Sequence, residues 1–147
     1  MDPLENSRRQ AVLVHAALAA SLGAYGLIFL MFRSRLTGLS SLPPPSPRLS
    51  LILGMIGVAQ FWFASWASRR ILRSRRSPVG QRVRRAFFLR AAAAEAIALY
   101  GLLAGFQGAP LGQVASLFAV SAVALSVCAP TRSAWKEAAG LAESSGP

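Results

Sequence analysis

The stretch "RAAAAEAIALYGLLAGF", residues 90–106, decides the fold: it is an apolar run with one acidic residue, Glu95, near its centre. Between Glu5 and Glu137 the chain holds no other Asp or Glu. About 20 apolar helical residues, at ~1.5 Å each, cover the ~30 Å hydrocarbon thickness of a bilayer. The free-energy cost of placing the Glu95 carboxyl group here therefore depends on whether water or lipid surrounds this run.

The composition favours a membrane protein. The chain has 147 residues, enough for one domain of ordinary size. Of these, 54% are hydrophobic and only 14% are charged, with a mean hydropathy of +0.45. Soluble domains carry about 25% charged residues, distributed over their whole surface.

The net charge of +11 comes almost entirely from arginine. In a soluble chain this value would suggest nucleic acid. Here nine arginines and no acid lie in residues 69–90, with an apolar run on each side. Such a loop is typically retained in the cytoplasm, where it meets anionic headgroups. We therefore expect no nucleic-acid partner, and favour anionic lipid over a specific acidic partner as the ligand of Arg69, Arg70, Arg73, Arg75, Arg76, Arg82, Arg84 and Arg85.

Four apolar runs predict an all-α membrane protein of one domain with two helical hairpins. The expected spans are residues 11–32, 49–68, 86–106 and 111–129. The short "QGAP" turn between the last two spans can join only antiparallel neighbours. The segments outside the membrane are then the N-terminus (1–10), a Pro-rich loop (33–48), the Arg-rich loop (69–85) and the tail (130–147).

The positive-inside tendency sets the orientation. With the Arg-rich loop in the cytoplasm, an even number of crossings places both termini there, in a bacterial-type inner membrane. The first run has an alternative interpretation as a signal peptide, and "SRRQAV" is similar to the twin-arginine export pattern. A retained span is favoured, because the run ends in Phe29, Met31 and Phe32 rather than at a small-residue cleavage site.

An internal similarity appears when the sequence is shifted by 75 residues. Span one then lies over span three, with Tyr25, Gly26 and Leu27 matching Tyr100, Gly101 and Leu102. Ala20 takes the place of Glu95. The two helices run in the same direction, so a duplication would be a parallel repeat of two hairpins. Chance similarity between alanine-rich spans is the alternative.

Glu95 lies near the predicted bilayer midplane, where an ionised carboxylate costs several kcal/mol. An acid in that position is neutral much of the time and loses its proton only when a cation or water approaches, which describes a proton carrier. Ala91, Ala92, Ala94 and Ala98 allow another helix to pack closely beside it. The alternative is a plain interhelical hydrogen bond worth ~1 kcal/mol.

The segment "AEAIALYGLLAGF", residues 94–106, resembles the carboxylate-bearing helix of the proteolipid (c) subunits of rotary F-, V- and A-type ATPases. In that family Glu precedes small and aliphatic residues and then Tyr-Gly-Leu, and the acid binds the transported proton or sodium ion. The resemblance implies that Glu95 carries the ion, that Tyr100 neighbours the site, and that the chain works in an oligomer or membrane complex. The sequence departs from the family in its long basic loop and in span two, where Gly54 and Gly57 are followed by bulky aromatic residues.

The remaining residues suggest no enzyme, cofactor or metal site. His15 is the only histidine and lacks partner ligands in the sequence, and the single Cys128 behaves as a small hydrophobe. No hydrolase elbow, phosphate-binding glycine loop or carboxylate pair occurs. The second function hypothesis is therefore a non-transporting membrane scaffold or assembly factor whose arginines hold anionic lipid or a cytoplasmic partner.

Overall fold

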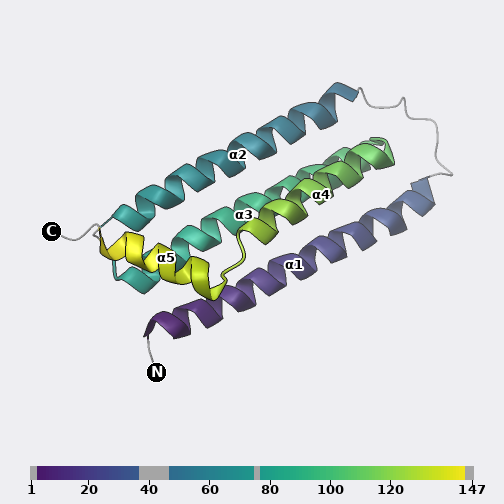
Figure 1. Ribbon diagram of the computed structural model, residues 1–147. Helices are drawn as coiled ribbons and strands as arrows, with labels where there is room; N and C mark the ends of the chain where they lie inside the picture. Colours follow the sequence, from purple (N-terminus) through teal and green to yellow (C-terminus); the bar gives the residue numbers. More distant parts are fainter. Residues whose placement is uncertain (1–2, 37–46, 75–76, 145–147) are drawn as a thin grey trace.

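The structure, a computed structural model, describes residues 3–36, 47–74 and 77–144, and all regular secondary structure within these ranges is helical. The expected all-α class is therefore confirmed for the described residues. Five helices follow one another along this part of the chain (Figure 1): α1 (Pro3–Leu36), α2 (Pro47–Arg73), α3 (Val79–Phe106), α4 (Leu111–Val127) and α5 (Arg132–Glu143).

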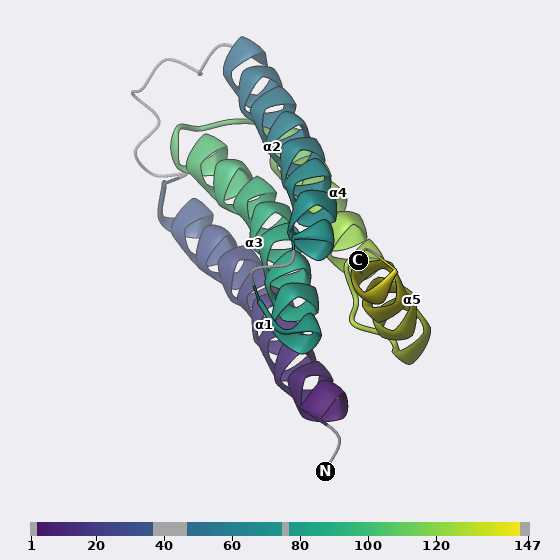
Figure 2. The ribbon, with the colours of Figure 1, turned by 90° about the vertical axis from the view of Figure 1, so that its left-hand side faces the viewer.

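Helix α3 is the centre of the molecule. It contacts α1, α2 and α4, and the views in Figures 1 and 2 place α1 and α2 on different sides of it. The expected hairpin of α3 and α4 is present. The other expected hairpin is not, because α1 and α2 make at most a minor contact and α2 packs antiparallel to α3 instead. Helices α1 and α3 run in the same direction, as the 75-residue similarity requires.

The helices continue past the predicted spans, above all in the segment expected to be an Arg-rich loop. Arg69–Arg73 form the last turn of α2, and residues 79–85 form the first turns of α3. Arginine is a good helix former, so a helix can extend into water beyond an apolar span. The basic segment is consequently helical over most of its described length, while Arg75 and Arg76 lie outside the described residues.

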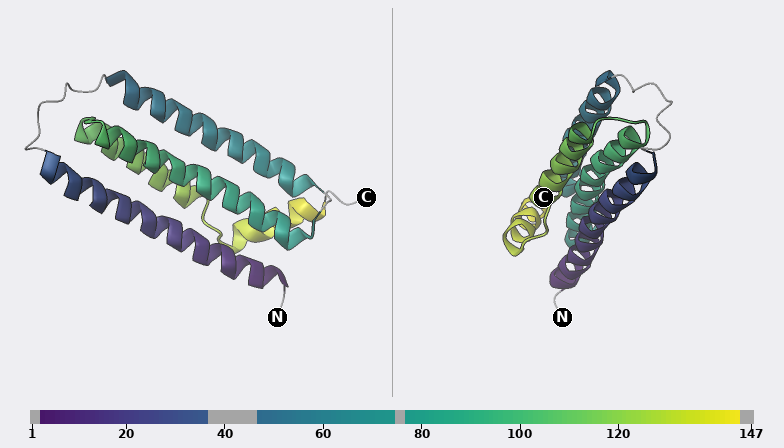
Figure 3. Two further views of the ribbon diagram at one scale, coloured as in Figure 1. Left: turned by 180° about the vertical axis from the view of Figure 1, so that it is seen from behind. Right: turned by 90° about the vertical axis from the view of Figure 1, so that its right-hand side faces the viewer.

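The chain bends by 65° between α4 and α5. Helix α4 ends before Pro130, which disfavours helical backbone at the residue preceding it. Helix α5 then begins after Thr131, whose side chain accepts a hydrogen bond from the Ala134 amide. Its buried face, led by Trp135, packs against the ends of α1, α2 and α3. The tail is thus a docked helix that crosses the end of the bundle (Figure 3).

The lengths and surfaces of the helices fit a multi-pass membrane protein. Within the described residues, α1, α2 and α3 are each long and apolar enough to cross a membrane, and a fourth crossing results if α4 and α5 count as one bent span. Large apolar side chains point away from the bundle on α1, α2 and α4: Leu13 is 71% exposed, Trp62 73% and Val123 65%. Large apolar side chains exposed on three helices are expected where the surface faces lipid or a partner.

Glycines allow the close approach of α2, α4 and α1 to α3. A Cβ added at Gly57 of α2 would lie 3.0 Å from Ile97 Cγ1. One added at Gly101 of α3 would lie 3.1 Å from Leu117 Cβ on α4, and one at Gly105 would overlap the Phe29 ring of α1. Backbone proximity of this kind supplies van der Waals contact where lipid offers no hydrophobic driving force.

We expect Gly101→Leu to lower the unfolding free energy by about 1–3 kcal/mol, because the added side chain overpacks the α3–α4 contact. Gly23→Leu is the matched control, since a Cβ at Gly23 has no atom within 4 Å. Unfolding in detergent micelles, followed by circular dichroism, measures both variants. Equal stability of the two proteins would contradict the close α3–α4 packing.

Candidate functional site

The Glu95 carboxyl group joins α3 to α1. Its Oε1 atom lies 2.6 Å from Ser21 Oγ and 3.0 Å from the Tyr25 hydroxyl oxygen, and both hydroxyl groups donate to it. Ser21 and Tyr25 are four residues apart and so lie on one face of α1. The three side chains, here called the Glu95 cluster, are half-buried.

The Glu95 cluster can hold either protonation state without moving a heavy atom. Ser21 Oγ is also 2.7 Å from the Leu18 carbonyl oxygen, but a serine hydroxyl has only one hydrogen to donate. When Glu95 is charged, Ser21 and Tyr25 both donate to Oε1. When Glu95 is protonated, its own hydroxyl can donate to Ser21 Oγ while Ser21 donates to Leu18. The two hydrogen-bond arrangements differ by the rotation of the Ser21 hydroxyl group.

The backbone beside Glu95 is fixed by small buried residues. Ala91, Ala94 and Ala98 are at most 5% exposed, which confirms the expectation that they form a packing face, while Ala92 is only half-buried. On α4, the buried Ser121 hydroxyl donates to the Ala94 carbonyl oxygen at 2.7 Å. Helix α4 therefore holds the peptide next to Glu95 while α1 holds its side chain.

Tyr100, expected beside Glu95, lies elsewhere. Its hydroxyl donates to Gln60 Oε1 of α2 at 2.8 Å. Five residues along a helix correspond to a rotation of about 140° net, so Glu95 and Tyr100 point to different neighbours. The structure instead brings Tyr25, the residue that aligns with Tyr100 in the 75-residue similarity, to the carboxyl group.

The 75-residue similarity contained a signal for this contact. The hydrogen bonds between α1 and α3 join residues that are 70 or 74 positions apart, close to that shift. Ser21 is also the residue directly after Ala20, the counterpart of Glu95. Treating the shift as a packing register would have predicted Ser21 as a neighbour of the acid, but it places Tyr25 opposite Tyr100 and not beside Glu95.

Other polar side chains connect the remaining helix pairs. Gln60 accepts from Tyr100, as described, and Gln113 of α4 accepts from the Ser50 hydroxyl of α2. Both glutamines thus hydrogen bond across helices. In an apolar solvent such bonds contribute modestly, with an average near 0.6 kcal/mol.

The predicted lipid-binding arginines divide into two groups. Arg69, Arg70, Arg73, Arg84 and Arg85 are exposed at the end of the bundle that also holds the start of α1, here called the arginine-rich end. Arg82 is only 8% exposed and donates to the Leu72 carbonyl oxygen at 2.9 Å. Because the last carbonyl groups of a helix lack intrahelical partners, Arg82 caps α2 and does not belong to the exposed set.

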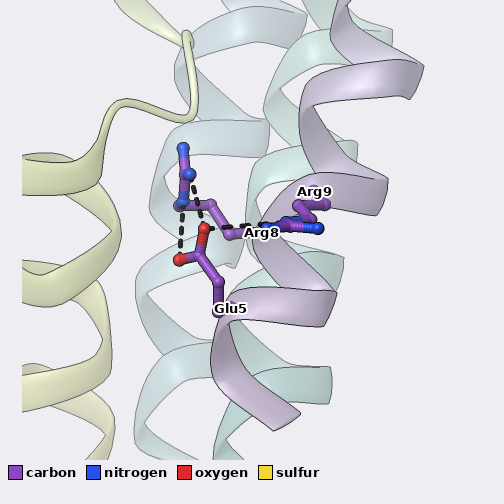
Figure 4. Close-up of polar contacts among 3 residues, drawn as sticks. All are labelled: Glu5, Arg8 and Arg9. Carbon is purple, nitrogen blue, oxygen red and sulfur yellow. Dashed lines mark hydrogen bonds and ion pairs between the residues drawn. The ribbon is translucent and has the colours of Figure 1, made fainter. Parts of the chain in front are cut away.

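These exposed arginines have no carboxylate partner among the described residues. Among the described residues, the ion pairs are those of Glu5 with Arg8 at 2.7 Å and with Arg9 at 3.9 Å, both within α1 (Figure 4). Arg70 instead lies 4.3 Å from the Trp66 ring centroid, a cation–π contact on the exposed side of α2. An aromatic ring beside a cation at this level suits a membrane interface.

Histidine and cysteine form no metal centre in the described part of the chain, where no group of three or more His, Cys, Asp or Glu side chains could hold an ion. Cys128 is a buried free thiol. His15 is half-buried, and its Nδ1 atom is buried without a hydrogen-bond partner among the described residues.

No family model matches the chain, and neither a curated protein nor a solved structure matches it significantly. The resemblance to c subunits stays a prediction based on residues 94–106.

Replacing Tyr25 by Phe should perturb Glu95, whereas Tyr100→Phe should not. Each variant loses one interhelical hydrogen bond and about 0.6 kcal/mol of stability, but only Tyr25 contacts the acid. Infrared spectroscopy can follow the carbonyl band of protonated Glu95, assigned by its absence in Glu95→Gln. A band that moves in Tyr100→Phe and stays in place in Tyr25→Phe would contradict the geometry.

Proposed function

We propose that Glu95 takes up and releases a proton, or binds a monovalent cation, within a four-span membrane protein. The observation that carries this proposal is that two hydroxyl groups of α1 converge on one oxygen of the acid that lies in the apolar part of α3. A merely structural hydrogen bond requires one partner. Both hydroxyl groups can donate to the charged carboxylate. The Ser21 hydroxyl can instead accept from the neutral carboxyl group, and this pair of arrangements suits a group that gains and loses a proton.

The proposed topology places the arginine-rich end in the cytoplasm. Both termini then lie inside, in a bacterial-type inner membrane, and α4 is the fourth span. Its 17 residues cover ~26 Å, slightly less than the hydrocarbon thickness. The 65° bend lets α5 lie along the interface, with Trp135 toward the bundle and charged residues toward water.

The resemblance to c subunits supplies a model for the exchange step. In that family a protonated acid loses its ion when it meets a stator arginine. In this protein the partners of Glu95 come from α1 of the same chain, so ion binding needs no neighbouring subunit. Exchange requires only that water or a cation reach the half-buried carboxyl group. When the proton leaves, Ser21 and Tyr25 stabilise the resulting carboxylate by donating hydrogen bonds to it.

The proposal predicts that a hydrophobic carbodiimide modifies Glu95 in reconstituted vesicles. Such reagents attack protonated carboxyl groups in apolar surroundings, so labelling should disappear in Glu95→Gln. Vesicles that contain the wild-type protein should also leak protons faster than those that contain Glu95→Gln. Peptide mass spectrometry locates the label, and a pH-sensitive dye measures the leak.

Glu137→Gln is the matched control, because Glu137 lies on the exposed face of α5. It should retain both labelling and leak. If Glu95→Gln behaves like the wild type in both assays, the proton-handling proposal is wrong, and Glu95 is a structural hydrogen bond.

A second candidate function rests on a separate observation, the exposed arginines without carboxylate partners at the arginine-rich end. A scaffold or assembly factor would use these cations to hold anionic lipid or an acidic cytoplasmic partner. Each cation near an anionic surface contributes about 1 kcal/mol. This role does not involve Glu95.

Under the scaffold hypothesis, the triple variant Arg73→Gln/Arg75→Gln/Arg76→Gln should reduce the enrichment of anionic lipid around the protein in mixed bilayers. The control is the triple variant Arg33→Gln/Arg35→Gln/Arg48→Gln, which removes the same number of charges at the other end of α1 and α2. Electron spin resonance with spin-labelled phosphatidylglycerol measures the enrichment. A greater loss in the control would contradict the proposed role of the arginine-rich end.

A further inference from the structure

A cleft of about 640 Å³ opens between α1 and α3 at the arginine-rich end. Its walls are apolar: Val14 comes from α1, Phe88 and Ala92 come from α3, and Pro130 closes the side toward α5. These wall residues of α1 and α3 belong to helices that qualify as membrane spans. The cleft therefore borders the region in which lipid chains surround the protein.

One end of the cleft is cationic. Arg84, Arg85 and Gln10 line it where α1 and α3 approach the arginine-rich end, and its lining contains no acidic residue. Arg84 donates to Gln10 Oε1 at 2.6 Å, which uses one of the five N–H donors of the guanidinium group. Within the described part of the chain, Arg85 makes one long contact of 3.5 Å, with the Ser77 hydroxyl. Both arginines thus have donors available for an anion.

His15 lies in the wall between the cationic and the apolar parts. It is five residues beyond Gln10 on α1, or ~7.5 Å further along the helix axis. Its Nδ1 atom has no hydrogen-bond partner among the described residues although it is buried. Because Nδ1 is buried, a ligand in the cleft can meet only the exposed part of the half-buried imidazole ring.

We propose that this cleft binds one anionic phospholipid. The headgroup phosphate lies at Arg84 and Arg85, an ester oxygen of the glycerol backbone lies at His15, and an acyl chain lies against Val14, Phe88 and Ala92. Along its length the cleft presents a cationic end, then one polar group and then an apolar wall. The chemical groups of such a lipid follow the same order. The guanidinium groups can bind the phosphate of either lipid class, but the lining offers no carboxylate for the cationic group of a zwitterionic headgroup, so charge complementarity favours an anionic lipid.

The lipid site is separate from the Glu95 cluster. Its deepest described lining residues on α3 are Ala91 and Ala92, about one helical turn before Glu95, and no member of the Glu95 cluster lines it. Lipid binding consequently does not rest on the proton-handling proposal. Glu95→Gln should bind the lipid as the wild type does, so the two proposals can fail independently.

Native mass spectrometry of the full-length protein in detergent, titrated with dioleoyl phosphatidylglycerol or dioleoyl phosphatidylcholine, tests the site. We expect one phosphatidylglycerol to be retained more tightly than any phosphatidylcholine. The double variant Arg84→Gln/Arg85→Gln should weaken that binding by roughly 30-fold, because each cation contributes about fivefold. Its control is Arg69→Gln/Arg70→Gln, which removes two charges of α2 that do not line the cleft.

Ala92→Trp tests the apolar wall, because the indole would occupy the space of the acyl chain. Ala119→Trp, at an exposed position of α4, controls for the added bulk. We expect loss of the tightly bound lipid only in Ala92→Trp, with an unchanged helical circular dichroism spectrum. Equal retention of the two lipids by the wild type, or equal binding by the cleft variants and their controls, would overturn the proposal.

Discussion

A carboxyl group inside an apolar helix must find polar partners, and this requirement ties α1 to α3. Lipid cannot hydrogen bond, so the partners of Glu95 have to come from another helix or from water. Ser21 and Tyr25 supply them from a single face of α1, at 2.6 and 3.0 Å from the same oxygen. The contact sets the rotation of α1 against α3 and the register between them. It also defines the site on which the functional proposal rests.

The rest of the bundle follows from the position of α3 among three neighbours. Alanine and glycine on several of its faces let α1, α2 and α4 approach closely, as Gly101 shows against Leu117. Each of these three interfaces carries a side-chain hydrogen bond: Glu95 toward α1, Tyr100 toward α2, and the Ala94 carbonyl toward Ser121 of α4. The large apolar residues are left on the outer faces, where lipid is a suitable solvent. Helix α3 is thus the element that the other helices enclose.

Charge gives the molecule two different ends. Most arginines gather where α1 begins, α2 ends and α3 begins, and α5 covers part of that end with Trp135 buried beneath it. Arg82 has a structural role there, because it caps α2, whereas Arg69, Arg70, Arg73, Arg84 and Arg85 have no carboxylate partner among the described residues. The proposed lipid cleft lies between this charged end and the Glu95 cluster. The sites proposed for lipid contact and for proton handling therefore occupy successive levels along the same pair of helices.

The sequence by itself determined the helical class, the apolar runs, the short turn between α3 and α4, and the exceptional position of Glu95. These features are local, because hydropathy, helix propensity and the inability of a short turn to separate two helices do not depend on distant residues. Only the tertiary structure decided that α3 lies between α1 and α2, that Tyr25 rather than Tyr100 meets the acid, and that the tail docks as α5. Several faces of α3 are lined with small residues, so its sequence does not show which neighbour each face receives. Long-range packing made that choice, through the fit of particular side chains such as Phe29 beside Gly105.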